Sequence, residues 1–378
     1  MDIRYIADNE GLETVRSALD SANRIALDCE AAGYHRYSDR LCLLQLTVGD
    51  STFVLDPFEV DPEPVLRPAL EDPGVEVLMH GADFDVRLLD RDLGIGLAGL
   101  FDTQIAASLL GVNALGLSSL LEDRLGVELS KKYQKADWAQ RPLPEPMLQY
   151  AALDTAHLHE LAAQLRDQLE SLDRLEWAKE EFRELQKVRF DPSPEDDPVL
   201  RVKKTRDLSP REIDRLREAL FWRDRIGREQ DRALFRVVGD DTLVAAARLN
   251  PTRVAELEDL QGMNTALARE WGADLIDRFR RVDHLPDSEL EGYPAGTSEE
   301  NGSRGRSSPE VEERFRSLKK VRNERATEMG IDRGTLLPNA ILQKIAEVPP
   351  ESPGAFDTID GMRRWQARLL AEDLLGAL

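Results

Sequence analysis

Two acidic residues that follow a short apolar run near the start of the chain constrain its fold more than any other feature. Apolar residues 25–27 lead into Asp28 and Glu30, which are separated by one residue. Side chains two apart on a strand point to the same face, so the carboxylates project together. Such a pair is costly to bury unless a divalent cation with oxygen ligands offsets the repulsion. Taken alone, the pair is more simply an ordinary exposed Asp-x-Glu at a strand edge.

The residues that follow predict more of the same sheet. Apolar residues 41–48, a turn at 49–50 and apolar residues 53–55 indicate two further strands joined by a hairpin. Residues 75–80 predict a short buried strand, and the helix after it ends at Gly94. Strand and helix signals alternate up to about residue 165. This alternation indicates an α/β domain.

Further acids fall on the helices of this domain. The helix after the short strand carries Asp83 and Asp85 in its first turn, and Asp102 is a predicted N-cap of a helix over 104–110. Asp83 points away from Asp85 on a helix and is assigned to the helix start. A predicted helix over 147–169 places Tyr150 and Asp154, four residues apart, on one face.

If the domain is compact, the carboxylates of Asp28, Glu30, Asp85 and Asp154 can converge. Four carboxylates suit two divalent ions a few ångströms apart, an arrangement that serves phosphoryl transfer by stabilising the attacking and leaving oxygens. The pattern therefore predicts a two-metal hydrolytic site, with Tyr150 beside the attacking water.

The composition bounds the class of protein. A chain of 378 residues with 41% hydrophobic content is long enough for two or three folded domains. A net charge of −22 argues against tight nonspecific nucleic-acid binding, which needs clustered Lys and Arg. Residues 201–236 run against this sign, with 12 Lys+Arg and 7 Asp+Glu, a net of 12 − 7 = +5. This segment either holds nucleic acid or is a solvated helix face.

The sequence also bears on location and cysteine chemistry. No apolar segment approaches the roughly 20 residues that span a bilayer, and the N-terminal residues lack a signal-peptide pattern. We therefore expect a cytoplasmic protein with no membrane partner. Cys29 and Cys42 fall within the predicted sheet, where small buried apolar roles are expected.

The C-terminal part contains an internal repeat. Helical patterns dominate from residue 209, and several residues recur 99 positions later: Arg223 and Arg322, Pro251 and Pro350, Leu260 and Ile359, Gly262-Met263 and Gly361-Met362. We infer a duplicated all-helical module. The expected organisation is an α/β domain at 1–170, a helix with an acidic, proline-rich linker at 171–208, a module at 209–284, a flexible linker at 285–308 and a second module at 309–378.

Three motifs of the first domain carry a family resemblance. LDCE (27–30), HGADFDVRLL (80–89) and YAALD (150–154) resemble the motifs of the DEDD superfamily of 3′–5′ exonucleases, in its tyrosine subgroup. The loop LSKKYQKADWAQRPL (129–143) resembles the bacterial ribonuclease D family, and the repeated module resembles HRDC domains. The resemblance implies a ribonuclease H-like mixed sheet flanked by helices, followed by two all-α HRDC domains.

The same resemblance implies roles for individual residues. Asp28, Glu30, Asp85 and Asp154 are the implied ligands of two divalent ions, and Tyr150 is implied to orient or help deprotonate the attacking water. Mg²⁺ is the expected ion and Mn²⁺ a substitute, because both favour oxygen ligands in octahedral geometry.

Five residues are candidates for contact with the substrate: His80, Trp138, Lys135, Arg141 and Tyr37. His80 follows a strand in a motif position, where a structural histidine is equally expected. Tyr37 lies in the loop after the acid pair and is a candidate for contact with the terminal base. Trp138, flanked by Lys135 and Arg141, either stacks a base or is a buried anchor.

The predicted function is a metal-dependent 3′–5′ exoribonuclease that releases 5′-mononucleotides. Its expected substrates are the 3′ ends of tRNA precursors and other structured RNA, held by the helical modules of a monomer. A 3′–5′ DNA exonuclease is an alternative, since the same acids serve both sugars. A non-catalytic nucleic-acid-binding adaptor is a second alternative.

Overall fold

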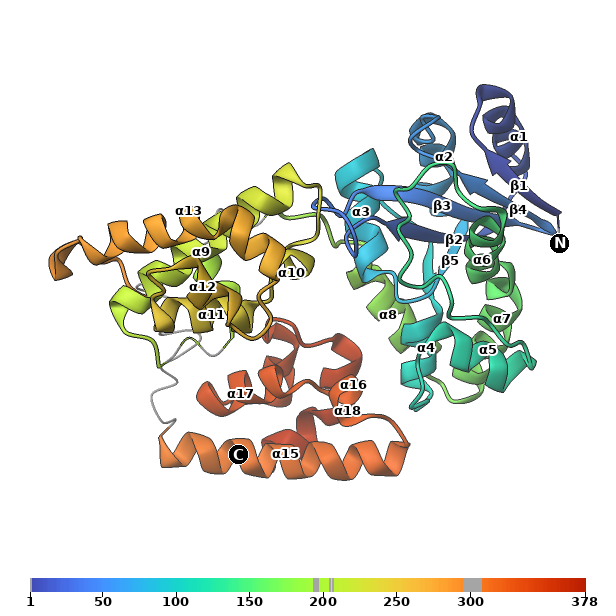
Figure 1. Cartoon of the computed structure of the whole chain (residues 1–378). Helices are drawn as coiled ribbons and strands as arrows, with labels where there is room; N and C mark the ends of the chain where they lie inside the picture. The colour runs from blue at the N-terminus through green and yellow to red at the C-terminus, as the bar shows by residue number, and fades with distance from the viewer. Residues whose placement is uncertain (1, 193–196, 204, 206, 295–307) are drawn as a thin grey trace. The chain divides into compact units, whose positions relative to one another are not determined.

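A computed structural model of the chain describes residues 2–192, 197–203, 205, 207–294 and 308–378 (Figure 1). By contacts the chain divides into two compact units, one formed by residues 1–31, 40–190 and 307–378 and the other by 32–39 and 191–306. The greater part of the predicted flexible linker, residues 295–307, lies outside the described residues, as do residues 193–196 of the predicted acidic linker.

The first unit is built on a six-stranded mixed sheet in the order β1-β4-β3-β2-β5-β6. Strand β3 is antiparallel to both β2 and β4, and the remaining pairs are parallel. The predicted strands and hairpin are confirmed, and the mixed sheet matches the expected fold class. The strands are β1 (Asp2–Ile6), β2 (Arg24–Ala31), β3 (Leu41–Val48), β4 (Ser51–Leu55), β5 (Glu76–Met79) and β6 (Leu100–Asp102).

Alternation along β2 assigns its side chains to two different layers. Ile25 and Leu27 join a core with α1 (Asn9–Leu19), α2 (Glu63–Leu70) and α3 (Asp83–Leu93), whereas Ala26 joins a core with other helices. Asp28 lies on the same face as Ala26 because it is two residues further along the strand. The predicted acid pair therefore projects from the face that α3 does not cover.

The opposite face is covered by two consecutive helices where one was predicted. The expected helix over 147–169 ends at Ala156, and a new helix begins at Leu158, because His157 leaves the helical conformation at φ −109° and ψ 3°. Helix α6 (Glu145–Ala156) packs on β2, β3 and β4, and α7 (Leu158–Ser171) packs on β2 and β5. The break lets the two halves follow different parts of the twisted sheet.

Three shorter helices complete the first domain. Helix α4 (Thr103–Leu109) begins at its predicted N-cap, since the Asp102 carboxylate accepts hydrogen bonds from the N–H groups of Gln104 and Ile105. Helices α5 (Leu117–Leu125) and α8 (Leu175–Leu185) pack with α7. No helix in the described parts of the chain is long and apolar enough to cross a membrane.

The second unit contains the first helical module. Its longest helix, α9, begins with a capping box in which Ser209 and Glu212 satisfy each other's backbone N–H groups. Trp222 is fully buried in the core of this module. The helices are α9 (Pro210–Glu229), α10 (Leu234–Val237), α11 (Asp240–Leu249), α12 (Val254–Glu258) and α13 (Thr265–Asp283), with short 3₁₀ turns at Pro198–Arg201 and Asp287–Glu289.

The second module repeats the architecture of the first, which confirms the predicted duplication. Arg223 donates from Nη1 to the carbonyl oxygen of Val238 at 3.0 Å, and Arg322 makes the same contact with Leu337 at 2.5 Å. Both pairs are 99 residues apart (322 − 223 and 337 − 238). The helices are α15 (Pro309–Met329), α16 (Arg333–Leu336), α17 (Asn339–Glu347) and α18 (Arg364–Leu375), with a 3₁₀ turn at Pro353–Thr358.

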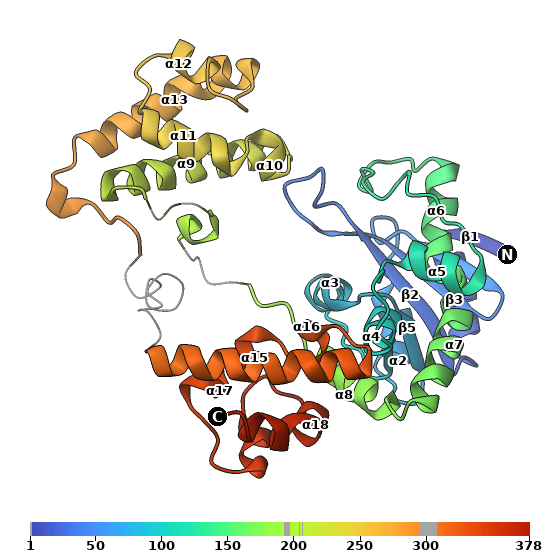
Figure 2. The same cartoon turned by 90° about the horizontal axis from the view of Figure 1, so that it is seen from below.

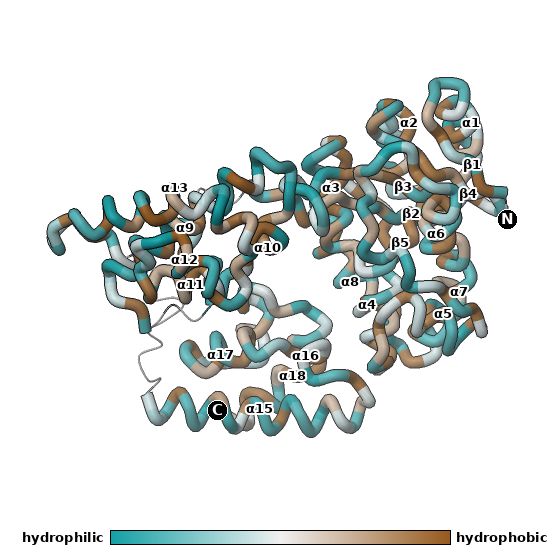
Figure 3. The backbone as a smooth tube through the Cα atoms, viewed as in Figure 1, coloured by the Kyte–Doolittle hydropathy of each residue, from teal (hydrophilic) through white to brown (hydrophobic). Residues whose placement is uncertain are grey.

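This second module packs directly on the first domain, within the same unit (Figure 2). The long helix α15 is hydrophilic along much of its length (Figure 3), and its buried residues Leu318 and Ala326 join the core that contains α4, α5, α7 and α8. Residues from α16, α17 and α18 belong to the same core. The first domain and the second module therefore share one hydrophobic core.

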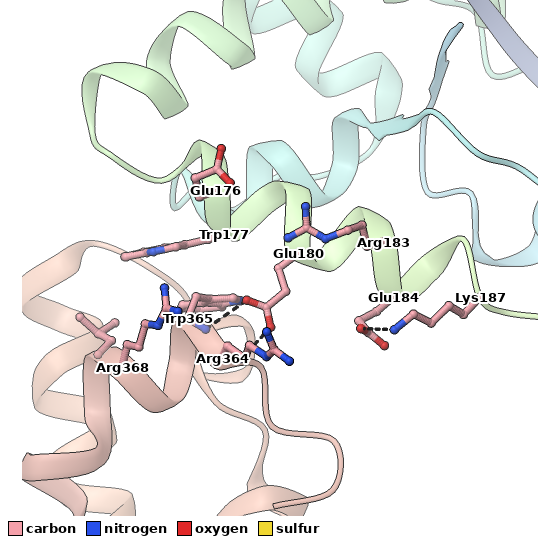
Figure 4. A pocket seen from close by; sticks show the side chains of 10 residues that line it. Glu176, Trp177, Glu180, Arg183, Glu184, Lys187, Arg364, Trp365 and Arg368 are labelled. Carbon is pink, nitrogen blue, oxygen red and sulfur yellow. Dashed lines mark hydrogen bonds and ion pairs between the residues drawn. The ribbon is translucent and has the colours of Figure 1, made fainter. Parts of the chain in front are cut away.

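The contact between α8 and α18 shows how the module is held (Figure 4). Trp365 stacks on Trp177 with a centroid separation of 4.7 Å and an interplanar angle of 13°. The Glu180 carboxylate accepts hydrogen bonds from the backbone N–H groups of Arg364 and Trp365, and so caps α18 from another element. The Glu181 carboxylate accepts the indole N–H of Trp365 at 2.9 Å. Trp365 is therefore buried against α8 as well as within its own module.

A second set of contacts fixes the end of α15. The Arg174 guanidinium donates to the carbonyl oxygens of Leu109 and Met329, both at 2.8 Å. Beside it, a Cβ on Gly111 would lie 1.7 Å from the carbonyl oxygen of Gly330, so only glycine permits this approach of two backbones. Residues 307–378 are therefore part of the fold of the first domain, and their removal would expose its core.

We predict that Trp365→Ala lowers the free energy of unfolding by about 3 kcal/mol or more, because it removes a buried ring from the shared core. Arg368→Ala, at an exposed position on the same helix, is the matched control and should change stability little. Thermal and urea unfolding measure both. Equal unfolding midpoints for the two variants would contradict the shared core.

Candidate active site

Three acids from two elements meet on the sheet face that α6 covers. Asp28 and Glu30 project from β2, and Asp154 projects from α6. One carboxylate oxygen from each lies within 4.8 Å of the others. The pairing of β2 with β3 shifts between Glu30 and Ala31, an irregularity that re-aims the end of the strand next to the acids. The sequence prediction that these three residues converge is thus realised in the structure.

Asp85 lies beside this group, although outside the 4.8 Å set. It is in the first turn of α3, it is only 7% exposed, and its charge raises the pKa of both Asp28 and Glu30. The loop that leads into α3 is held by Asp102, whose carboxylate accepts hydrogen bonds from the N–H groups of Gly81 and Ala82. Asp102 therefore positions α3 as well as capping α4.

The electrostatics of the four acids are unfavourable without cations. Burial, followed by the charge of Asp85, raises the pKa of Asp28 well above its ordinary value, and burial, followed by the charge of Asp154, does the same for Glu30. Burial, with a contribution from Asp102, raises the pKa of Asp85 to about 7, and burial raises that of Asp154 to about 7. Asp85 and Asp154 are therefore partly protonated at neutral pH in the metal-free protein.

The donor set fits divalent ions. Within the described parts of the chain, no Lys, Arg or His forms an ion pair with any of these acids, so their charge is not balanced by the protein. The donors are all carboxylate oxygens, the ligands that Mg²⁺ and Mn²⁺ prefer. By contrast, Asp83 on the same helix as Asp85 is exposed and paired with Arg87, as its assignment to the helix start implies.

Tyr150 lies one helical turn before Asp154 on α6. Burial, followed by the charges of Asp154, Glu30 and Asp28, raises the pKa of its phenol well above 10. The ring lies 6.1 Å from that of Trp138. Tyr150 therefore presents a protonated hydroxyl to the acid cluster.

Trp138 is an anchor of the loop at 129–143. Its side chain is 2% exposed and lies against Tyr150, which leaves no open face on which a base could stack. Of the two predicted roles, the geometry favours the buried anchor. The contact also gives Trp138 a part in fixing the ring of Tyr150.

Arg141, a predicted substrate contact, is bound to other parts of the protein. Its guanidinium donates from Nε and Nη2 to the buried carboxylate of Asp56, from Nη1 to the carbonyl oxygens of Trp138 and Gln140, and from Nη2 to that of Cys42. These contacts use all five N–H groups of the side chain. Arg141 therefore holds the loop to the sheet and has no donor left for a phosphate.

Tyr37 is also engaged by the protein. The loop at 32–39 belongs to the second unit, where the Tyr37 hydroxyl donates to the Asp224 carboxylate at 2.7 Å and accepts from Arg228 at 3.1 Å. Arg228 also lies over the tyrosine ring. This arrangement assigns Tyr37 to fixing the loop on α9, and contact with a terminal base stays a prediction.

Contact of the other two candidates, His80 and Lys135, with the substrate stays a prediction. His80 accepts or donates a hydrogen bond between Nδ1 and the hydroxyl of Thr103 at 2.9 Å, and burial, opposed by the charge of Asp102, lowers its pKa. It is thus a largely neutral histidine held by α4. Lys135 lies in the exposed part of the loop.

The basic segment at 201–236 is less available than its composition indicates. Ion pairs with acids, several of them outside the segment, neutralise six of its cations: Arg211, Arg215, Arg217, Arg223, Arg225 and Arg228. Among the residues of this segment that the structure describes, half or more of the cations are thus balanced by an acid. That the segment holds RNA stays a prediction.

The sequence interpretation missed Gln45, which lies in the run that it described as apolar. Gln45 is completely buried and faces Asp28 in the register of β2 and β3. The available signal was a single amide in the middle of a strand that otherwise consists of Leu, Cys, Thr and Val.

Comparison with known proteins identifies the family of the chain. The family model for 3′-5′ exonucleases matches residues 3–170, and the HRDC domain model matches 212–278 and 311–378. A ribonuclease D from Shewanella is 30% identical over 281 residues, which are 74% of this chain and 72% of that protein. The chain belongs to the ribonuclease D family.

Two further comparisons extend over the full length. Ribonuclease D from Pseudomonas paraeruginosa is 28% identical over 379 residues, covering 100% of this chain and 98% of that protein. The crystal structure of RNase D from Escherichia coli, an exoribonuclease involved in structured RNA processing, has a TM-score of 0.72 and 25% identity, covering 100% and 99% of the two chains. By family, the chain is a 3′–5′ exoribonuclease.

Asp154→Asn should stabilise the metal-free protein while abolishing hydrolysis. The neutral amide removes one of four crowded charges, and one pKa unit corresponds to about 1.4 kcal/mol, so we expect a gain of about 1–3 kcal/mol in EDTA at alkaline pH. Asp83→Asn, at the exposed paired acid, should change neither stability nor turnover. Unfolding experiments measure the stability of both variants, and nuclease assays measure their turnover. A loss of stability in Asp154→Asn would contradict the prediction and show that the carboxylate supports the fold.

The stability of the metal-free protein should fall as pH rises from about 4 to about 7. Folding raises the pKa of Asp85 and Asp154 from 3.8 to about 7, so the folded chain binds these protons more tightly than the unfolded chain. Their contribution is fully present below about pH 4 and is lost as pH rises through about 7. Melting temperatures in EDTA should show this slope, and a flat profile that is identical in Asp154→Asn would contradict the raised pKa values.

Proposed function

We propose that this protein is a metal-dependent 3′–5′ exoribonuclease that trims structured RNA, tRNA precursors included, and releases 5′-mononucleotides. The observation that carries the proposal is the convergence of three carboxylates from β2 and α6 within 4.8 Å, beside a fourth buried acid. The role of the related Escherichia coli enzyme in structured RNA processing supports the substrate class. We further propose that the protein acts as a cytoplasmic monomer.

In this proposal Asp28, Glu30, Asp85 and Asp154 hold two divalent ions, Mg²⁺ physiologically with Mn²⁺ as a substitute. Such ions, when bound, activate a water molecule and stabilise the departing 3′ oxygen. The acids contribute by binding, and their mutual repulsion favours cation entry. Their burial limits the access of other ligands.

Tyr150 acts in this proposal as a hydrogen-bond donor that orients the attacking water. Its raised pKa supports this role over that of a base, because a phenol that resists ionisation beside three carboxylates does not accept a proton readily. The ring is held by Trp138 on one side and lies 5.8 Å from that of Tyr133.

Two of the five predicted substrate contacts remain candidates. Lys135 is exposed on the loop that anchors Tyr150, and we propose that it meets the phosphate backbone. The Nε2 atom of His80 is buried and has no hydrogen-bond partner in the described parts of the chain, and contact of His80 with the terminal nucleotide stays a prediction. Trp138, Arg141 and Tyr37 are assigned to positioning.

Matched RNA and DNA oligomers with a hairpin and a single-stranded 3′ tail test the proposal. With Mg²⁺ the protein should release 5′-mononucleotides from the RNA tail, and EDTA should stop the release. Equal turnover of the DNA would replace the RNA assignment with a DNA exonuclease. Binding of RNA without any release, with Mg²⁺ or Mn²⁺, would favour the adaptor.

A further inference from the structure

The amide of Gln45 is an anomaly in the middle of the sheet. Its strand, β3, is central, and Gln45 has no exposed surface. Neither its Oε1 nor its Nε2 atom has a hydrogen-bond partner in the described parts of the chain. A buried polar group without a partner costs about 1–3 kcal/mol, so a side chain with two such atoms needs a reason to be there.

The register of the sheet places this amide beside the acid cluster. Gln45 is directly opposite Asp28 in the antiparallel pair of β3 and β2. Opposite residues of such a pair project from the same face with Cβ atoms about 4.5–5.5 Å apart. Helix α6, which carries Asp154, packs on this face of the strands.

The hydroxyls nearest to Gln45 show that its side chain lies on the sheet face that α6 covers. They are hydrogen-bonded to one another and not to the amide of Gln45. Thr47, two residues further along β3, bonds to the hydroxyl of Thr155 on α6 at 2.8 Å and to that of Thr52 at 2.8 Å. These three hydroxyls satisfy one another. In the other direction, the polar side chains that face Gln45 across β2 are the carboxylates of the site.

We propose that Gln45 is a positioning residue of the active site. Because Nε2 has no direct partner among the described residues, its N–H group reaches the ionised carboxylate of Asp28 through one buried water molecule. This bridge fixes the orientation in which Asp28 offers its remaining lone pairs to a cation. Side chains that orient metal ligands in this way commonly contribute about 10–100-fold to metal affinity or activity. The inference rests on the proposed metal-dependent function of this site.

The test compares Gln45→Met, which keeps the length and removes the amide, with Gln45→Asn, which keeps the amide and withdraws it by one methylene. Thr52→Val, which removes a buried hydroxyl from the same face, is the matched control. Affinity for Mn²⁺ is measured by calorimetry without RNA, alongside kcat, KM and the melting temperature of each variant.

Both Gln45 variants should bind Mn²⁺ about 10–100-fold more weakly and lose kcat in proportion, with KM for RNA within about 2-fold of the wild type. Thr52→Val should retain metal affinity and kcat. If Gln45→Met does not fold, the affinity of Gln45→Asn decides. Unchanged metal affinity in the folded variants would overturn the proposal, because a structural role moves only the melting temperature. Failure of the proposed function would give a different result, because the wild-type protein itself would then lack metal-dependent hydrolysis.

Discussion

The crowding of four acids, Asp85 buried and the other three partly buried, is the constraint on which the rest of the structure depends. Burial raises the pKa of all four acids, and neighbouring acids raise it further for Asp28, Glu30 and Asp85, so the fold places these groups where their charged forms are disfavoured. The opposing free energy comes from the apolar cores on the two faces of the sheet. Such a site favours cation binding, because a bound cation offsets the repulsion between the carboxylates that folding brings together.

The elements around the site serve to keep the acids in place. Asp102 connects the loop before α3 to the start of α4, and thereby holds the turn that carries Asp85. Arg141 connects the loop at 129–143 to the sheet, and Trp138 on that loop supports Tyr150. The second helical module extends the same support, since it shares a core with α4, α7 and α8. Its established role in this structure is packing.

Short-range spacing explains what could be predicted from the sequence. The strand pair, the hairpin, the cap at Asp102 and the shared face of Tyr150 and Asp154 all follow from residues a few positions apart. The roles of Arg141 and Trp365 could not be predicted in this way, because their partners Asp56 and Glu181 lie 85 and 184 residues away. From sequence alone, an Arg or Lys side chain near a catalytic motif is easily taken for a substrate contact, because its acidic partner within the protein cannot be seen.

The fold keeps Asp85 and Asp154 partly protonated at neutral pH, so a cation that binds these carboxylates must displace their protons. Calorimetric titration of the metal-free protein with Mn²⁺ at about pH 7, in buffers of different ionisation enthalpy, measures the protons released per bound ion. The account predicts two bound ions per chain with net proton release that disappears at alkaline pH, where the acids are already ionised. Binding without proton release at neutral pH, or no binding, would contradict it.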